Sequence, residues 1–144
     1  MSEAYRTSIE IAAEPERVFD HFVNPELLVR WMGGHARLEA REDGIFGVDI
    51  NGVIIRGHFV RVERRLLEIA WGEPGNKVMP PGSTRLVVRL TPTDLGTRVE
   101  LEHHGLVPEE ARKHAIGWPH FLDRLRVLGG GGDPGADPWA VARE

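Results

Sequence analysis

The dipeptide Asn51-Gly52 constrains the fold of this chain more than any other feature, because it separates two segments of alternating apolar residues. A two-residue hairpin turn of type I′ needs positive φ at both central positions, and Asn-Gly is a pair that adopts this turn readily. Such a turn places Ile50 opposite Val53 and Val48 opposite Ile55, so these side chains share one face of an antiparallel pair. The pattern predicts a sheet that is apolar on one side and polar on the other.

Further segments alternate between apolar and polar residues in the same way. Each predicts a strand with one dry and one charged face, and a sheet built from such strands is covered on a single side. Beyond Phe59 the alternation slips to Val60 and Val62, which predicts a β-bulge or a twisted strand end. We also expect Gly57 to leave a gap beneath the sheet, because it has no side chain. The predicted strands occupy residues 6–11, 36–40, 44–50, 53–59, 67–71, 86–90 and 99–103.

The periodicity of helices appears in three segments. Two short helices, 15–22 and 25–32, follow the first strand, and each begins with a proline, which the first helical turn tolerates. A long helix is predicted over 108–128, where Gly117 and Pro119 predict a kink or a restart near Trp118. Its apolar stripe consists of Ala111, Ala115, Trp118, Leu122 and Leu125, and its charged side includes Glu110 and Arg124.

The predicted fold class is α+β, with a curved seven-stranded antiparallel sheet wrapped around the long C-terminal helix. At 144 residues the chain fits one domain, which we place at residues 1–128. Residues 129–144 begin with four glycines and contain two prolines. This composition predicts a flexible tail with one apolar spot at 139–141.

Charge and composition exclude several classes of function. The 18 Lys and Arg residues are outnumbered by 22 Asp and Glu, and the net charge of -4 gives no general attraction to nucleic acid or anionic lipid. There is no cysteine, which excludes a disulfide framework and a thiolate nucleophile. No stretch approaches the roughly 20 apolar residues that span a bilayer, and the first residues do not form a signal peptide. We therefore expect a soluble, cytoplasmic protein with no nucleic-acid partner and no membrane insertion.

Three motifs carry a resemblance to a known family. They are IEIAAEPERVFDHFVNPELLVRW near the N-terminus, LEHHGL at the end of the last strand, and GWPHFLDRLRVLGG in the last helix. Together with the predicted order of elements, they resemble the START-like helix-grip (SRPBCC) superfamily, and within it the family related to the activator of Hsp90 ATPase. The resemblance runs from Arg6 to Gly130.

This resemblance implies a deep cavity between the sheet and the last helix, which members use for lipids, hormones, aromatic polyketide intermediates or other apolar metabolites. We therefore expect a carrier or sensor of a small hydrophobic or aromatic molecule, acting as a monomer or homodimer and without a cofactor. One alternative is an enzyme similar to polyketide cyclases and dehydratases that uses the same cavity. The other is a co-chaperone-like adaptor, although the chain lacks the additional N-terminal domain of that co-chaperone, so Hsp90 is not the expected partner.

The candidate ligand-binding residues are inward-facing strand positions and the helix residues opposite them. A concave sheet beneath one helix is hard to fill at native packing density, so these side chains are expected to leave a cavity. Taken singly, each apolar member is also an ordinary core residue. The set is Trp31, Phe46, Val48, Ile55, Trp71, His103, Trp118, Phe121 and Leu122.

His103 is the polar group that strand alternation directs inward. It is interpreted either as a core histidine hydrogen-bonded to the last helix or its loop, or as the residue that orients the polar end of a ligand. A catalytic role needs a carboxylate partner, and the alternation turns Glu100 and Glu102 outward. His103 and His104 lie on opposite faces of a strand, and there is no HExxH motif, so zinc is not expected. No catalytic or metal-ligating residue is predicted.

Overall fold

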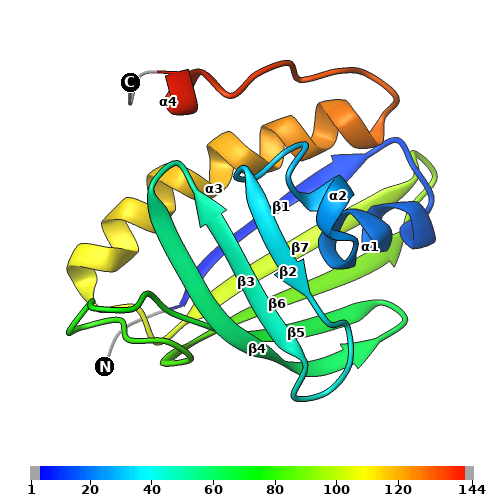
Figure 1. The fold of residues 1–144 in the computed structure, drawn as a ribbon. Coiled ribbons are helices and arrows are strands. Elements are labelled where there is room, and N and C mark those ends of the chain that lie inside the picture. The colour runs from blue at the N-terminus through cyan, green and yellow to red at the C-terminus, as the bar shows by residue number, and fades with distance from the viewer. Residues whose placement is uncertain (1–3, 142–144) are drawn as a thin grey trace.

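The computed structural model describes residues 4–141. Seven antiparallel strands form one sheet in the order β1-β7-β6-β5-β4-β3-β2, and the long helix α3 lies across its concave face (Figure 1). The predicted fold class is confirmed. The strands are β1 (Tyr5–Ile11), β2 (His35–Leu38), β3 (Ile45–Ile50), β4 (Val53–Glu63), β5 (Leu66–Trp71), β6 (Thr84–Pro92) and β7 (Thr97–His104).

The β3–β4 hairpin has the register that its turn predicts. Asn51 and Gly52 have φ of 51° and 93°, and Ile50 pairs with Val53 across the turn. The predicted bulge is present as well, because the register of β4 against β5 shifts between residues 59 and 61. The expected gap at Gly57 is wrong, since a Cβ atom there would lie 1.7 Å from the carbonyl oxygen of Ala70. At this position the main chain of β5 occupies the space that a side chain would take.

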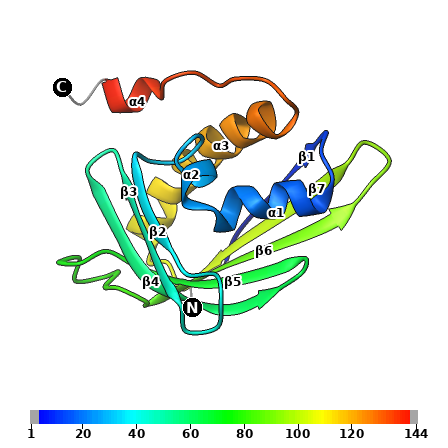
Figure 2. The same cartoon turned by 45° about the vertical axis from the view of Figure 1, so that its right-hand side comes forward.

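Two short helices lie beneath one end of the sheet. Helix α1 (Pro15–Val23) and helix α2 (Pro25–Leu28) sit beside the C-terminal end of α3 (Figure 2). The second is shorter than the predicted 25–32, because the chain tightens after Leu28 into turns in which the N–H groups of Arg30 and Trp31 bond to the carbonyl three residues earlier. These turns place Trp31 and Met32 in the core.

Helix α3 (Pro108–Gly129) runs without interruption, so the predicted restart near Trp118 is wrong. Pro119 cannot donate to the carbonyl of Ala115, which is four residues earlier. Both residues are exposed, so water can bond to that carbonyl instead. The exposure of Ala115 also removes it from the predicted apolar stripe.

The charged side of α3 was assigned incorrectly at two residues. Glu110 and Arg124 are 5% and 9% exposed, although the periodicity placed them toward solvent. Arg124 is buried because its guanidinium donates hydrogen bonds to carbonyl groups before β2 and after α3. The accepting carbonyls belong to Arg30, Trp31, Pro134 and Gly135.

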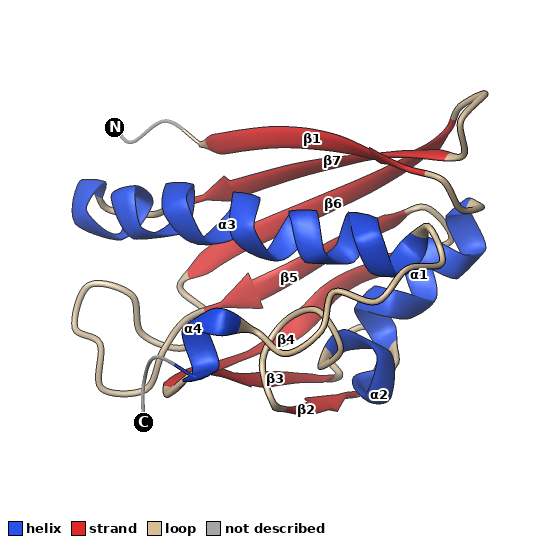
Figure 3. Cartoon of the chain, turned by 90° about the horizontal axis from the view of Figure 1, so that it is seen from above, coloured by secondary structure: helices blue, strands red, loops and turns tan. Residues whose placement is uncertain are grey.

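The segment after α3 turns back along that helix and includes the short helix α4 (Pro138–Val141) (Figure 3). The Asp137 carboxylate accepts a hydrogen bond from Asn51 Nδ2 at 3.0 Å and lies 2.8 Å from His120 Nε2. The Trp139 ring stacks on His120 with centroids 3.7 Å apart. This segment, for which the sequence predicts a flexible tail, thus contacts both α3 and the β3–β4 turn.

One end of the core lies where α1 and α2 pack beside α3, and we call this region the packed end. Trp31 is fully buried there, and its Nε1–H donates to the His21 carbonyl at 2.9 Å. Phe22 packs edge-on against the Trp31 ring. Gly129 of α3 lies so close to Ile11 that a Cβ atom would approach the Ile11 Cγ2 to 2.6 Å. Between residues 4 and 141, no helix has both the length and the apolar composition needed to cross a membrane.

Candidate ligand-binding site

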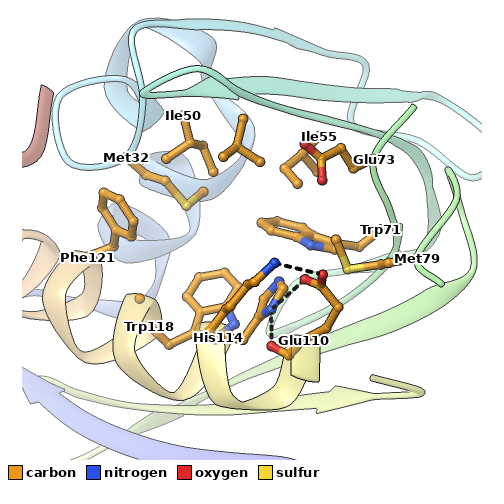
Figure 4. Close-up of a pocket in the computed structure, with 13 residues that line it drawn as sticks. Met32, Ile50, Ile55, Trp71, Glu73, Met79, Glu110, His114, Trp118 and Phe121 are labelled. Atoms are coloured by element: carbon orange, nitrogen blue, oxygen red, sulfur yellow. Dashed lines mark hydrogen bonds and ion pairs between the residues drawn. The ribbon is translucent and has the colours of Figure 1, made fainter. Parts of the chain in front are cut away.

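A pocket of about 310 Å³ lies at the opposite end of α3, between this helix and strands β3 to β5 (Figure 4). We call this region the open end. Its volume falls within the range of small-molecule sites, which are concave and mostly apolar. The lining residues are Met32, Ile50, Val53, Ile55, Trp71, Glu73, Met79, Glu110, Lys113, His114, Gly117, Trp118 and Phe121.

Three parts of the chain build this pocket. The β3–β4 hairpin supplies apolar side chains close to its turn, and Trp71 is the last residue of β5. The Pro- and Gly-rich loop 72–83 then folds over the site and contributes Glu73 and the buried Met79. Helix α3 contributes residues at steps of one, three and four, which is the spacing of a single helical face. These helix residues are Glu110, Lys113, His114, Gly117, Trp118 and Phe121.

The structure divides the predicted site residues into two groups. Ile55, Trp71, Trp118 and Phe121 line the pocket. The others are buried but are not part of its lining, and they pack in the core around it. This second group consists of Trp31, Phe46, Val48, His103 and Leu122.

His103 is fixed by hydrogen bonds at both ring nitrogens. Trp118 Nε1–H donates to His103 Nδ1 at 3.2 Å, so the other nitrogen, Nε2, carries the proton and donates to Thr84 Oγ1 at 2.9 Å. The Thr84 hydroxyl donates in turn to the Trp71 carbonyl at 2.8 Å. Burial lowers the pKa of His103 to about 2, with smaller effects from His114 and His104, so the ring is neutral. The first interpretation of His103, a core histidine hydrogen-bonded to the last helix, predicts the bond from Trp118.

The polar part of the pocket is centred on Glu110 and His114. Lys113 Nζ and Asn76 Nδ2 each lie 3.3 Å from Glu110 Oε2, so this buried carboxylate has two partners. The His114 Nδ1–H donates to the Glu110 carbonyl oxygen at 2.7 Å. Burial lowers the pKa of His114, against the opposing effect of Glu110. Asn76 also joins loop 72–83 to α3, because its Nδ2 lies within hydrogen-bonding distance of Glu73 in the loop and of Glu110 in the helix.

Trp71 has a buried donor without a partner. Its side chain is 3% exposed, and its Nε1 is the one buried side-chain nitrogen or oxygen that lacks a hydrogen bond in the described part of the chain. The ring packs against Trp118 and lies edge-on to His114. Such an unsatisfied group is unusual, because the large majority of buried polar atoms in proteins are hydrogen-bonded.

Sequence reasoning missed the polar residues of the pocket. Glu110, Lys113 and His114 look like a solvated helix face, and Lys113 is indeed exposed, whereas Glu110 is buried and His114 half-buried where loop 72–83 folds over α3. Their spacing relative to Trp118 was the available signal, since 110, 114 and 118 lie on one side of a helix. Within residues 4–141, no three His, Asp or Glu side chains form a group that could hold a metal ion.

Comparisons with known proteins agree on one family. The model of the family "Activator of Hsp90 ATPase homolog 1-like protein" matches residues 12–130. The solution structure of an AHSA1-like protein from Rhizobium etli is 34% identical, with 94% of this chain and 87% of that chain covered and a TM-score of 0.73. A search of curated proteins finds no match.

Two more distant structures share the fold. CalU16 from Micromonospora echinospora is 24% identical, with 97% of this chain and 81% of that chain covered and a TM-score of 0.69. An Hsp90 activator from Plasmodium falciparum is 18% identical, with 90% of this chain and 97% of that chain covered and a TM-score of 0.74. At these identities the likeness extends to the fold alone.

Proposed function

Because the chain belongs to the family of Activator of Hsp90 ATPase homolog 1-like proteins, we propose that it binds a small hydrophobic or aromatic molecule at the open end, as a carrier or sensor. The observation that carries the proposal is the pocket itself, which has a volume of about 310 Å³ and a mostly apolar lining. A cavity that served only as a packing defect would lower stability, because it forfeits contacts between its walls. A bound ligand restores those contacts.

A cyclase-like enzyme in the same pocket is the alternative that a specific observation favours. The sequence directed attention to His103, but both nitrogens of that ring are already engaged by Trp118 and Thr84. His114 instead lines the pocket, with its Nδ1 bonded to the Glu110 carbonyl. A neutral imidazole in that position can accept a proton from a bound substrate. Turnover of an aromatic polyketide that is lost in His114→Phe supports the enzyme, whereas binding without turnover supports the carrier.

Gly117 allows a sharp test of ligand binding. It lines the pocket from α3, and a Cβ atom added there meets no heavy atom within 4 Å. Gly117→Leu therefore has room for its first side-chain carbon, and its side chain extends into space that a ligand would occupy. The matched control is Ala115→Leu, which places the same side chain at an exposed position two residues away on the same helix.

The probe for this test is N-phenyl-1-naphthylamine, a neutral dye whose fluorescence rises in apolar surroundings. We expect the unmodified protein and Ala115→Leu to bind it equally, and Gly117→Leu to bind at least about tenfold more weakly because of overpacking. Circular dichroism checks that all three chains are folded. Equal binding by Gly117→Leu, or no binding by the unmodified protein, contradicts the proposal.

A further inference from the structure

The open end contains one hydrogen-bond donor that the protein leaves unused. Trp71 Nε1–H is buried and has no partner within residues 4–141, and Trp71 lines the pocket. Figure 4 shows the ring nitrogen on the edge of Trp71 that is turned toward Glu110 and His114. Burying an amide-like N–H without an acceptor is costly, so an acceptor atom from a ligand at this place gains more affinity than an ordinary surface hydrogen bond.

The same part of the pocket contains an acceptor. His114 Nδ1 must carry a proton, because its partner at 2.7 Å is the carbonyl oxygen of Glu110, which can only accept. The neutral ring therefore presents the lone pair of Nε2, which takes part in no hydrogen bond between residues 4 and 141. Burial lowers the pKa of His114, which keeps this lone pair available at neutral pH. The ring centroids of Trp71 and His114 are 6.1 Å apart, so one small group can reach both side chains.

Charge at this end of the pocket disfavours an anion. Two carboxylates, Glu73 and Glu110, line it together with one ammonium group, Lys113. Lys113 Nζ is already 3.3 Å from Glu110 Oε2, so its charge is compensated. A ligand carboxylate would lose water and meet no uncompensated positive charge there, which is unfavourable.

We propose that the pocket selects apolar ligands that carry a neutral hydroxyl group, such as phenols and hydroxylated polycyclic molecules. The hydroxyl oxygen accepts the Trp71 Nε1–H, and the hydroxyl hydrogen is donated to His114 Nε2. The rest of the ligand packs on Met32, Ile50 and Phe121 at the apolar side of the pocket. This inference rests on the proposed function and adds to it the chemical class of the ligand.

Four naphthalene probes test the inference on the unmodified protein. They are naphthalene, 2-methoxynaphthalene, 2-naphthol and 2-naphthoate, and their affinities are measured by displacement of the fluorescent dye. We expect 2-naphthol to bind about tenfold more tightly than naphthalene, since it satisfies a buried donor. The methoxy compound, which accepts but cannot donate, is expected between these two, and the carboxylate is expected to bind most weakly.

The probes separate failure of the inference from failure of the proposed function. If none of them binds, the proposed function is wrong. If naphthalene binds but 2-naphthol shows no advantage, or if 2-naphthoate binds most tightly, the pocket takes apolar ligands and the hydroxyl selection is wrong.

Trp71→Phe removes the donor and keeps an aromatic ring. In this variant we expect the ratio of the 2-naphthol affinity to the naphthalene affinity to fall from about tenfold to about twofold, and this ratio is compared because the smaller ring also changes the apolar contacts of both probes. An undiminished advantage overturns the role of Trp71. The order of the four probes on the unmodified protein decides the inference should this variant fail to fold.

Discussion

Two tryptophans occupy the two ends of the space beneath the sheet, and their surroundings differ. At the packed end, Trp31 is fully buried and its indole N–H bonds to a main-chain carbonyl. At the open end, Trp71 is nearly as buried, but its N–H has no partner in the described chain and its ring faces a cavity. Beneath the same sheet and helix, one end is thus a packed core with its indole N–H hydrogen-bonded, and the other end contains a cavity and an indole N–H without a partner.

The difference follows from what covers each end. At the packed end, helices α1 and α2 pack against each other and α1 contacts α3 (Figure 2). Loop 72–83 covers the open end, where it is held to α3 by Asn76 and contributes the buried apolar side chain of Met79 to the pocket. One end therefore stabilises the fold, and the other is available for a ligand.

The largest expected contrast comes from truncating one buried side chain at each end. Leu125→Ala at the packed end should lower the free energy of unfolding by about 3 kcal/mol, because Leu125 is fully buried and a new cavity forms. Met79→Ala at the open end should cost about 1 kcal/mol, because Met79 already borders empty space on one side. Urea denaturation measures both values. Equal losses would mean that the two ends are packed alike.

Acid should weaken the open end, because His114 lines the pocket and the buried His103 packs behind Trp71 and Trp118. The pKa of His103 is lowered to about 2 in the folded state, so the unfolded chain takes up a proton near pH 6.5 while the native chain does not. Stability should therefore fall as pH drops below 6.5, by about 1.4 kcal/mol per pH unit for this group. His114 acts in the same direction.

The control for this pH dependence is His103→Gln, which retains a hydrogen-bonding side chain that does not titrate. The free energy of unfolding, measured with urea, should fall between pH 7 and pH 5. We expect this fall to be about 2 kcal/mol smaller in the variant than in the unmodified protein. If the free energy of unfolding depends on pH equally in the two chains, His103 is not held neutral in the folded protein.

A smaller effect of opposite sign is expected from two glycines of α3. Gly129→Ala at the packed end brings a methyl group to 2.6 Å from Ile11 Cγ2, so it should destabilise the protein by about 1 kcal/mol. Gly117→Ala at the open end meets nothing within 4 Å and should stabilise the helix by about 0.5 to 1 kcal/mol. Thermal unfolding of both variants gives the signs. A loss of stability in Gly117→Ala would place hidden packing at the open end.

The comparison also shows where the sequence is informative. The Asn51-Gly52 turn and the strand alternation predict the sheet, its register and the side that faces α3, because these depend on local conformation and on the period of apolar residues. Alternation gives a face but not a depth. Neither strand alternation nor helical periodicity could separate Trp71, which borders the cavity, from Trp31, which lies in the packed end.

Two buried charged residues of α3, one of them in the site, could not be predicted from periodicity for another reason. Glu110 and Arg124 are buried by partners far away in sequence, namely Asn76 of the loop and the carbonyl groups of Arg30 and Trp31. From sequence alone, a charged residue in a helix is predicted to face solvent unless such a partner is known. These assignments therefore required the tertiary structure.

The central claim is that the open end takes a ligand and the packed end does not. Nuclear magnetic resonance of the indole N–H groups tests it most directly, because each of the four tryptophans gives its own signal. Titration with 2-naphthol should shift the Trp71 signal to an end point while the Trp31 signal stays in place. Equal shifts at Trp31 and Trp71, or no shift of any indole signal at saturating 2-naphthol, would contradict the account.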